Sequence, residues 1–461
     1  MKKPTSVKPM QHQQISMEFL ASTPRALDMS DPGTGKTFVE IEDVYRNYRD
    51  DNDATLVLAP KSLLQSAWGD DIDKFRPDLP YSVAWAENRE EAFKQHAAVY
   101  ITNIDAATWL AKQKPAFFKR FSRLIIDEST AFKHATSQRS KAMAKIAKHF
   151  EFRRAMSGTF YSNHITDVWH QTYLIDDGKR LGNSFFKFRA AVCDPVQNGP
   201  KAEHIKWEER SNARAAVAAL LQDITVRHVF EDCIDIPANH EYTVPHHLPK
   251  KLRRVYDQME AASIAEFKGK IISAPNAAVV QAKLQQIASG AVYALGDTEG
   301  VGAYELLDTS RYELIADMVE QRQHGVVFFH WTHQRDELIK QFDKRGITWC
   351  LYDGTVGDKA RAQNKRDFQA GFYNVFLAHP KSAGHGLTLT KGTYTLWASP
   401  TYSAELLRQG KQRVYRNTQQ SKTENIILLG ADTVDQFAHE RCNDRTMRGA
   451  ELNSYLENYR K

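Results

Sequence analysis

The sequence has few cysteines for its length. Among 461 residues there are four, and none forms a CxxC pair with another. Structural zinc sites draw on closely spaced cysteine pairs, and disulfide frameworks need a higher cysteine content. We therefore expect reduced thiols and no structural metal. The four positions are Cys193, Cys233, Cys350 and Cys442.

Long apolar runs are also missing. No stretch approaches the roughly 18 apolar residues that a membrane-spanning helix needs. The basic start, MKKPTSVKPMQHQQ, lacks the apolar core of a signal peptide. Internal repeats and low-complexity segments are absent from the sequence as well. These absences predict an intracellular, cytoplasmic protein with no membrane partner.

The charge balance is only mildly basic. Lys and Arg number 62 against 56 Asp and Glu, a formal net charge of +6, and the pI is near 8.9. Such an excess is compatible with a polyanionic partner but does not establish one, because many basic proteins bind no nucleic acid. The length is too great for one ordinary core and predicts two or three domains.

Short apolar runs alternate with helical patterns in both halves of the chain. This alternation predicts an α/β fold with two parallel-sheet domains in tandem. The boundary is expected near 233–240, which gives one domain over 1–235, with a helical insertion about 180–230, and a second over 236–461, with a helical lead-in about 245–320. The expected strands are 54–60, 97–103, 123–129 and 154–159, then 325–331, 347–353, 374–380, 393–399 and 424–430.

The stretch MSDPGTGKT, residues 29–37, has the composition of a phosphate-binding loop. Gly33 and Gly35 would let backbone N–H groups wrap the phosphates, Lys36 would offset their charge, and the Thr37 hydroxyl would bind Mg²⁺. The match is imperfect, because Ser30 stands where the first glycine of such a loop belongs. A glycine turn before an amphipathic helix is the alternative.

A phosphate-binding loop predicts an acidic partner at the end of an apolar strand. The stretch RLIIDEST supplies one. Asp127 is the candidate ligand of Mg²⁺, and Glu128 is placed to orient and deprotonate the attacking water. The alternative is that both acids cap the following helix.

The stretch LLRQGKQRVYRNTQ, residues 406–419, identifies a family. It resembles the arginine motif of superfamily 2 helicase-type ATPases in their Swi/Snf-like form. In that family, arginines from the second of two RecA-like domains reach the γ-phosphate, and Arg413 and Arg416 match those positions. A solvated or phosphate-binding basic helix face is the alternative for this stretch alone.

Other motifs follow in the order of that family, from about residue 8 to 440. They include MQHQQISMEFL, LVLAPKSLLQSAW, VYITNIDA, RRAMSGTFYSN and AHPKSAGHGLTLT. The resemblance implies two RecA-like domains that bind ATP and Mg²⁺, and it implies roles for single residues. Gln13 would read adenine, and Thr34 and Gly386 would also line the nucleotide. Ser157, Gly158, Thr159 and Gln409 would couple hydrolysis to DNA, and Lys61, Ser62, Thr102, Asn103 and Lys381 would face the DNA backbone.

The chain departs from the family pattern at several positions. DEST replaces the usual DEAH or DEGH, so Ser129 and Thr130 lack the imidazole that contacts the coupling motif, and we expect coupling through hydroxyls. Phe160 stands in place of a proline, Thr418 in place of a glycine and Thr388 in place of an asparagine. DEST and the short length suggest a compact phage or bacterial member, acting in the host cytoplasm if phage-encoded.

The resemblance implies an ATP-dependent motor that moves mainly on double-stranded DNA and remodels replication, recombination or repair intermediates. Three alternatives stay open: a strand-separating DNA or RNA helicase, a P-loop ATPase that remodels proteins without nucleic acid, and a non-catalytic DNA clamp. The sequence leaves protein partners unknown. Trp331 could stack on bases or, as a strand-end aromatic, pack between the domains.

Overall fold

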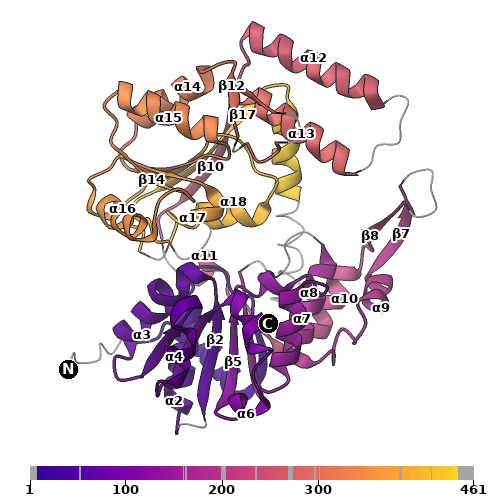
Figure 1. The fold of residues 1–461 in the computed structure, drawn as a ribbon, viewed down its shortest axis with the longest axis vertical. Helices are drawn as coiled ribbons and strands as arrows, with labels where there is room; N and C mark the ends of the chain where they lie inside the picture. The colour runs from indigo at the N-terminus through magenta and orange to yellow at the C-terminus, as the bar shows by residue number, and fades with distance from the viewer. Residues whose placement is uncertain are drawn as a thin grey trace. The chain divides into compact units, whose positions relative to one another are not determined.

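The protein, studied as a computed structural model, divides into two compact units, one ending at Asp235 and the other beginning at Ile236. The structure describes residues 8–50, 53–158, 160, 164–198, 204–233, 236–267, 274–294, 297–300, 302–383, 387–416 and 418–444. Figure 1 labels the elements in chain order. Each unit is an α/β fold, which confirms the predicted fold class.

Unit 1 is built on a seven-stranded sheet in the order β3-β4-β2-β5-β6-β1-β9. Every pair of neighbours in it runs parallel. The strands are β1 (Arg25–Asp28), β2 (Ala54–Ala59), β3 (Tyr81–Ala84), β4 (Val99–Asn103), β5 (Phe121–Asp127), β6 (Phe152–Met156) and β9 (Thr225–Val226). The helices are α1 (Gln11–Ser22), α2 (Lys36–Asn47), α3 (Asp70–Phe75), α4 (Arg89–Lys94), α5 (Ala107–Leu110), α6 (Pro115–Phe118), α7 (Gln138–Ala147), α8 (Val168–Asp176), α9 (Phe185–Val192), α10 (Ala213–Leu221) and α11 (Phe230–Cys233).

Strand β2 shows why this sheet is buried on both faces. All six of its residues are buried, and successive side chains enter different cores: Leu56 and Leu58 join one hydrophobic cluster, Val57 and Ala59 another. A continuous apolar run is typical of a parallel strand covered on both sides by helices. The arrangement brings the carboxyl ends of β1 and β5 to one edge, where ligands of such sheets bind.

Unit 2 repeats the design with six parallel strands in the order β10-β17-β16-β13-β15-β14. Val326 and Phe328 of β13 enter one hydrophobic cluster and Val327 another, so this sheet too is covered on both faces. The strands are β10 (Asn239–His246), β13 (Gly325–Phe328), β14 (Trp349–Tyr352), β15 (Val375–Ala378), β16 (Tyr394–Trp397) and β17 (Thr423–Gly430), beside a small antiparallel pair, β11 (Ala291–Tyr293) and β12 (Tyr304–Leu306). The helices are α12 (Lys250–Phe267), α13 (Ala274–Ala288), α14 (Ser310–Glu320), α15 (Thr332–Lys344), α16 (Asp358–Ala370), α17 (Pro380–Ala383) and α18 (Ala404–Lys411).

The insertion expected to be helical over about 180–230 is different in the structure. Helices α9 and α10 are joined through an antiparallel hairpin, β7 (Cys193–Gln197) and β8 (Ile205–Glu209). Figure 1 shows these strands projecting from unit 1. Four of the five β7 residues are exposed, so this strand has no apolar run or alternating burial to distinguish it in the sequence.

Candidate nucleotide site

The loop of residues 29–35 joins β1 to α2. Gly33 and Gly35 have φ of +91° and +87°, a backbone region in which side chains are disfavoured. A Cβ on Gly33 would lie 2.8 Å from the Phe230 ring, and a Cβ on Gly35 would overlap the amide of Gln13. Both positions therefore require glycine, and the loop keeps its backbone open to a ligand as a phosphate cradle does.

The Lys36 amine points back into this loop. Its Nζ donates to the carbonyl oxygens of Ser30, at 2.7 Å, and Asp31, at 3.1 Å. Burial lowers the pKa of Lys36, and nearby carboxylates oppose this change, namely Asp28, Glu128, Asp127 and Asp31. A half-buried cation next to a glycine cradle fits the polyphosphate of a nucleotide.

Helix α1 approaches the same loop. Gln13 donates from Nε2 to the carbonyl oxygen of Thr34 at 3.2 Å, and its Oε1 accepts from the N–H of Met10 at 3.0 Å. His12 contacts the same Thr34 carbonyl through Nε2 at 2.8 Å. Gln13 and Thr34 thus meet at the loop, and their contacts with the nucleotide stay predictions. The contact of His12 was not predicted, because nothing in its local sequence marks it.

Asp127 and Glu128 lie at the carboxyl end of β5. Asp127 is the last residue of that strand and 8% exposed, and its Oδ2 accepts from Trp68 Nε1 at 2.9 Å. Thr37 lies in the first turn of α2. A carboxylate and a hydroxyl are hard oxygen ligands, so these two residues fit Mg²⁺. Within the described residues, no group of three or more His, Cys, Asp or Glu side chains is placed to hold a further metal.

Glu128 has an unusual backbone. Its φ of +54° lies in the left-handed region. This region is energetically unfavourable for residues that have a Cβ, and such residues adopt it preferentially at functional sites. Its Oε2 accepts a long hydrogen bond, 3.5 Å, from the hydroxyl of Ser157. The predicted catalytic acid and the predicted coupling serine are therefore in direct contact, and Gly158 follows Ser157 as a buried residue.

A second set of hydrogen bonds begins at Ser129, the residue after Glu128. Ser129 donates from its hydroxyl to Oε1 of Gln171 at 2.7 Å, and Gln171 donates from Nε2 to the carbonyl oxygen of Phe160 at 2.9 Å. The Ser129 hydroxyl is thus linked, through Gln171, to the residue that follows the coupling motif, and coupling through this hydroxyl stays a prediction. Gln171 was missed, because its place on α8 gives no sign of a contact 42 residues away.

The largest contribution that was missed comes from residues 226–230, which begin with the last residue of β9. They bind the phosphate loop through backbone and side-chain hydrogen bonds involving Met29, Ser30 and Asp31. These residues are about 200 positions from the loop in the sequence. No local pattern predicts such a pairing.

In unit 2, the two arginines of the predicted motif lie beside the loop that contains Leu387 and Thr388. Arg413 and Arg416 both donate from Nη1 to the carbonyl oxygen of Leu387, at 3.2 and 3.1 Å. Arg416 also donates to the hydroxyl of Thr388 at 2.7 Å. Gln409, on α18, donates to Glu405 at 3.2 Å. The predicted arginine motif therefore packs on the 387–388 backbone in its own unit.

The predicted DNA-facing residues differ in their surroundings. The Lys61 amine lies 4.4 Å from the ring centroid of Trp85, and Asn103 accepts from Arg89 at 3.0 Å. Thr102 is fully buried and donates to the carbonyl oxygen of Ala84 at 2.6 Å. The expectation that the Thr102 side chain faces DNA is therefore corrected, because that side chain points into the sheet.

Two more residues can be placed. Lys381 is exposed on α17. Trp331 is 7% exposed and packs within unit 2 against Ala291 and Tyr293, an environment that neither of its two expected roles described. Three other predicted residues cannot be placed in this way: the Ser62 side chain, Thr159 and Gly386 lie outside what the structure describes.

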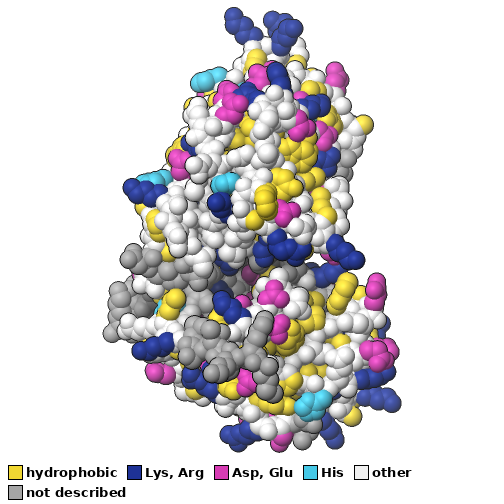
Figure 2. Space-filling view, turned by 90° about the vertical axis from the view of Figure 1, so that its left-hand side faces the viewer, with side chains coloured by type: hydrophobic (Ala, Val, Ile, Leu, Met, Phe, Trp, Pro, Cys, Tyr) yellow, Lys and Arg dark blue, Asp and Glu magenta, His cyan; other side chains and the backbone are white. Residues whose placement is uncertain are grey.

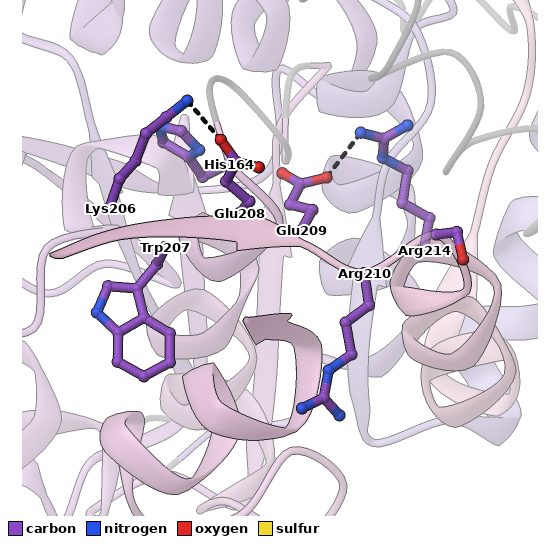
Figure 3. A pocket seen from close by; sticks show the side chains of 8 residues that line it. His164, Lys206, Trp207, Glu208, Glu209, Arg210 and Arg214 are labelled. Carbon is purple, nitrogen blue, oxygen red and sulfur yellow. Dashed lines mark hydrogen bonds and ion pairs between the residues drawn. The ribbon is translucent and has the colours of Figure 1, made fainter. Parts of the chain in front are cut away.

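The surface gives no single basic patch on the face drawn in Figure 2, where Lys and Arg side chains are interspersed with Asp and Glu over both units. Figure 3 shows a cavity beside β8, of about 410 Å³. Its charges are paired: Lys206 with Glu208 at 2.8 Å, and Arg214 with Glu209 at 2.6 Å. None of its lining residues belongs to the predicted site, so the candidate site stays at the β1 and β5 edge.

Comparisons with known proteins give the family. The SNF2-related domain matches residues 12–289, and the helicase conserved C-terminal domain matches residues 310–418. The chain belongs to the SNF2-related family. It is an ATP hydrolase of the helicase type, and the resemblance read from the motifs is confirmed. In the part of the chain that the structure describes, no helix is long and apolar enough to cross a membrane.

Among individual relatives, "Putative protein p41" of Acyrthosiphon pisum secondary endosymbiont phage 1 is 27% identical over 95% of this chain and 96% of its own length. The mouse "Chromodomain-helicase-DNA-binding protein 1-like" is 21% identical over 84% of this chain, which spans only 43% of that protein. Among solved structures, the Sulfolobus solfataricus SWI2/SNF2 ATPase core in complex with double-stranded DNA is 17% identical, with a TM-score of 0.45, covering 98% of this chain and 95% of that one.

Proposed function

We propose that this SNF2-related ATPase couples ATP hydrolysis to movement along double-stranded DNA. The observation that carries the proposal is the contact between Ser157 and Glu128. It joins the residue assigned to activating water with the residue assigned to coupling, so a change at either can be transmitted to the other.

Within the nucleotide site, we assign binding to the loop glycines and Lys36, and the adenine contact to Gln13. Bound Mg²⁺, held by Thr37 and Asp127, would neutralise charge on the phosphates. Glu128 would take the proton of the attacking water. Arg416, with Arg413, would supply positive charge where negative charge develops in the transition state.

For the track, we assign Lys61, Asn103 and Lys381 to the phosphate backbone. Backbone contacts need no base readout, which suits a motor that moves over any sequence. DNA as the partner is supported by the mouse relative, whose name includes helicase and DNA-binding. The phage relative supports a setting inside a bacterial host. As the task of the motor there, we propose remodelling of replication, recombination or repair intermediates.

The test is displacement of a third strand. A linear duplex carrying a triplex-forming oligonucleotide is incubated with protein and ATP, beside a forked duplex with one labelled strand. Translocation on duplex DNA predicts ATP-dependent release of the third strand while the forked duplex stays annealed, and no release by Lys36→Ala. Release from the forked substrate alone would favour a strand-separating helicase, and release from neither would contradict the proposal.

A further inference from the structure

The segment after β9 runs alongside the phosphate-binding loop. Strand β9 pairs with β1 in parallel register, and the pairing continues past both strands. The N–H of Met29 donates to the carbonyl oxygen of Val226, and the N–H of Asp31 to that of His228, both at 2.9 Å. The first half of the loop thus extends the sheet by two further backbone hydrogen bonds beyond the end of β1.

Side chains reinforce this ladder. Arg227 donates from Nη1 to the carbonyl oxygen of Met29 at 2.8 Å and to Oδ1 of Asp31 at 3.2 Å. The other carboxylate oxygen of Asp31 accepts from the N–H of Phe230 at 3.2 Å. The two side chains are only 8% and 13% exposed, so this ion pair is little screened by solvent and each of its hydrogen bonds is charge-assisted.

Ser30 completes the connection. Its hydroxyl accepts from the N–H of His228 at 3.1 Å, and the His228 ring contacts the hydroxyl of Ser16 on α1 at 3.0 Å. Ser30 is the residue that replaces the first glycine of the loop pattern. A glycine there would leave this backbone N–H without the hydroxyl that it now binds.

Ser30 and Asp31, the two loop residues bound by this segment, also bind Lys36. The carbonyl oxygens of Ser30 and Asp31 are the two acceptors of Lys36 Nζ. Residues 227–230 therefore fix both side chains, and the N–H of Asp31, in the same two residues whose carbonyls orient the amine. Phe230 adds a steric limit, because its ring occupies the space that a Cβ on Gly33 would need.

We propose that residues 227–230 form a strap that holds the phosphate-binding loop in its binding conformation, with Arg227 as a positioning residue for Lys36. The strap touches no phosphate itself. It removes conformational freedom from the loop before the nucleotide arrives, so that less ordering is required on binding. The inference rests on nucleotide binding and is independent of the identity of the DNA track.

Ser30 is expected to serve this loop better than the common glycine, because its hydroxyl binds the strap. Restoring the common glycine with Ser30→Gly removes the contact to His228 and adds backbone freedom. We expect binding of a fluorescent, non-hydrolysable ATP analogue to weaken about threefold, as for loss of one ordinary hydrogen bond. If the loop needed only its glycines, the same change would leave affinity unchanged or improve it.

Arg227→Met is the stronger test. It keeps length and apolar bulk but removes the charge, and we expect about tenfold weaker analogue binding because charge-assisted hydrogen bonds are lost. Arg227→Lys, which keeps the charge, should recover part of the affinity. At saturating ATP, kcat should change less than twofold, because Lys36 is intact and the loop is ordered once filled.

The matched control is Arg180→Met. Arg180 forms an ion pair with Asp223 in the same unit, through Nε at 2.9 Å, and is outside the site. Should Arg227→Met lower thermal stability as Arg180→Met does while analogue affinity stays at the wild-type value, the strap is merely structural and the inference is overturned. If Arg227→Met does not fold, Ser30→Gly decides. Failure of the wild type to bind the analogue would instead overturn the nucleotide site itself.

Discussion

The hydroxyl of Ser129 donates to Oε1 of Gln171 at 2.7 Å, in a fully buried position. Nε2 of Gln171 in turn donates to the carbonyl oxygens of Phe160 and Asp167, both at 2.9 Å. Ser129, at one end of this series of hydrogen bonds, is next to Glu128, and Phe160, at the other end, is next to the coupling motif. A buried amide with both of its ends engaged keeps two loops in fixed register, because breaking either contact leaves a polar group unsatisfied.

Replacing Gln171 should therefore weaken coupling. Gln171→Leu keeps volume but removes all three side-chain hydrogen bonds, and we expect stimulation of ATP hydrolysis by double-stranded DNA to fall at least about fivefold, equal to roughly 1 kcal/mol. Basal hydrolysis without DNA should change much less. The matched control is Thr172→Val, since Thr172 is equally buried and its hydroxyl bonds only within α8, to Val168, at 2.9 Å. Equal loss in both variants, or an unchanged stimulation ratio in Gln171→Leu, would show that the link is only structural.

Lys36 and Glu128 should fail in different ways. Lys36→Ala removes the charge that meets the phosphates, so nucleotide binding and hydrolysis should both be lost. Glu128→Gln keeps shape but not basicity, so binding should persist while turnover falls by about 10²–10⁴, the usual contribution of a general base. Equilibrium binding and single-turnover hydrolysis separate the two. Wild-type turnover in Glu128→Gln would remove this residue from its catalytic role.

Arg416 should act on the transition state. Arg416→Ala is expected to reduce hydrolysis about 10³-fold or more while leaving ATP affinity near the wild-type value. Thr388→Val removes the hydroxyl that holds Arg416 and should give a smaller loss, and Thr418→Val, at a hydroxyl that contacts Thr390, is the control. A KM effect with unchanged kcat in Arg416→Ala would assign this arginine to ground-state binding instead.

Glu40 should make the stability of unit 1 depend on pH. Burial raises its pKa to about 8, and the charge of Arg154 opposes the change. The folded state then keeps a proton that the unfolded chain releases near its ordinary pKa of 4.5, so stability falls as pH rises between these values, by at most about 5 kcal/mol. Glu40→Gln cannot ionise. From pH 5.5 to 8.5 its melting temperature should fall less than that of the wild type, by at least about 5 °C. Parallel curves would mean that Glu40 is ionised throughout.

The fold was predictable where physical signals are local. Val57 and its neighbours form an apolar run that is typical of a strand covered on both faces, and all nine expected strands appear with shifted ends. Gly33, Gly35 and Lys36 were recognisable because phosphate binding dictates residue type at fixed spacing. In contrast, β7 is mostly exposed and contains Pro195, so it has no strand pattern.

The rest of the site depends on contacts that no local pattern encodes. Arg227 pairs with Asp31 across 196 positions, and Gln171 meets Ser129 through the packing of α8. For Thr102, the motif led to a wrong prediction. Its place in the motif suggested a side chain exposed at the surface, but the alternation of side chains along a strand directs it inward. Ser30 looked like a defect in the loop pattern, and in the structure its hydroxyl binds the backbone of His228.

The central claim is that hydrolysis is coupled to a double-stranded DNA track. Its most direct test is steady-state ATP hydrolysis by the full chain, alone and with double-stranded DNA, single-stranded DNA or RNA, with Lys36→Ala as the control. The account predicts low basal hydrolysis, strong stimulation by double-stranded DNA and none in Lys36→Ala. Hydrolysis that is indifferent to every nucleic acid would contradict it and point to an ATPase that remodels proteins.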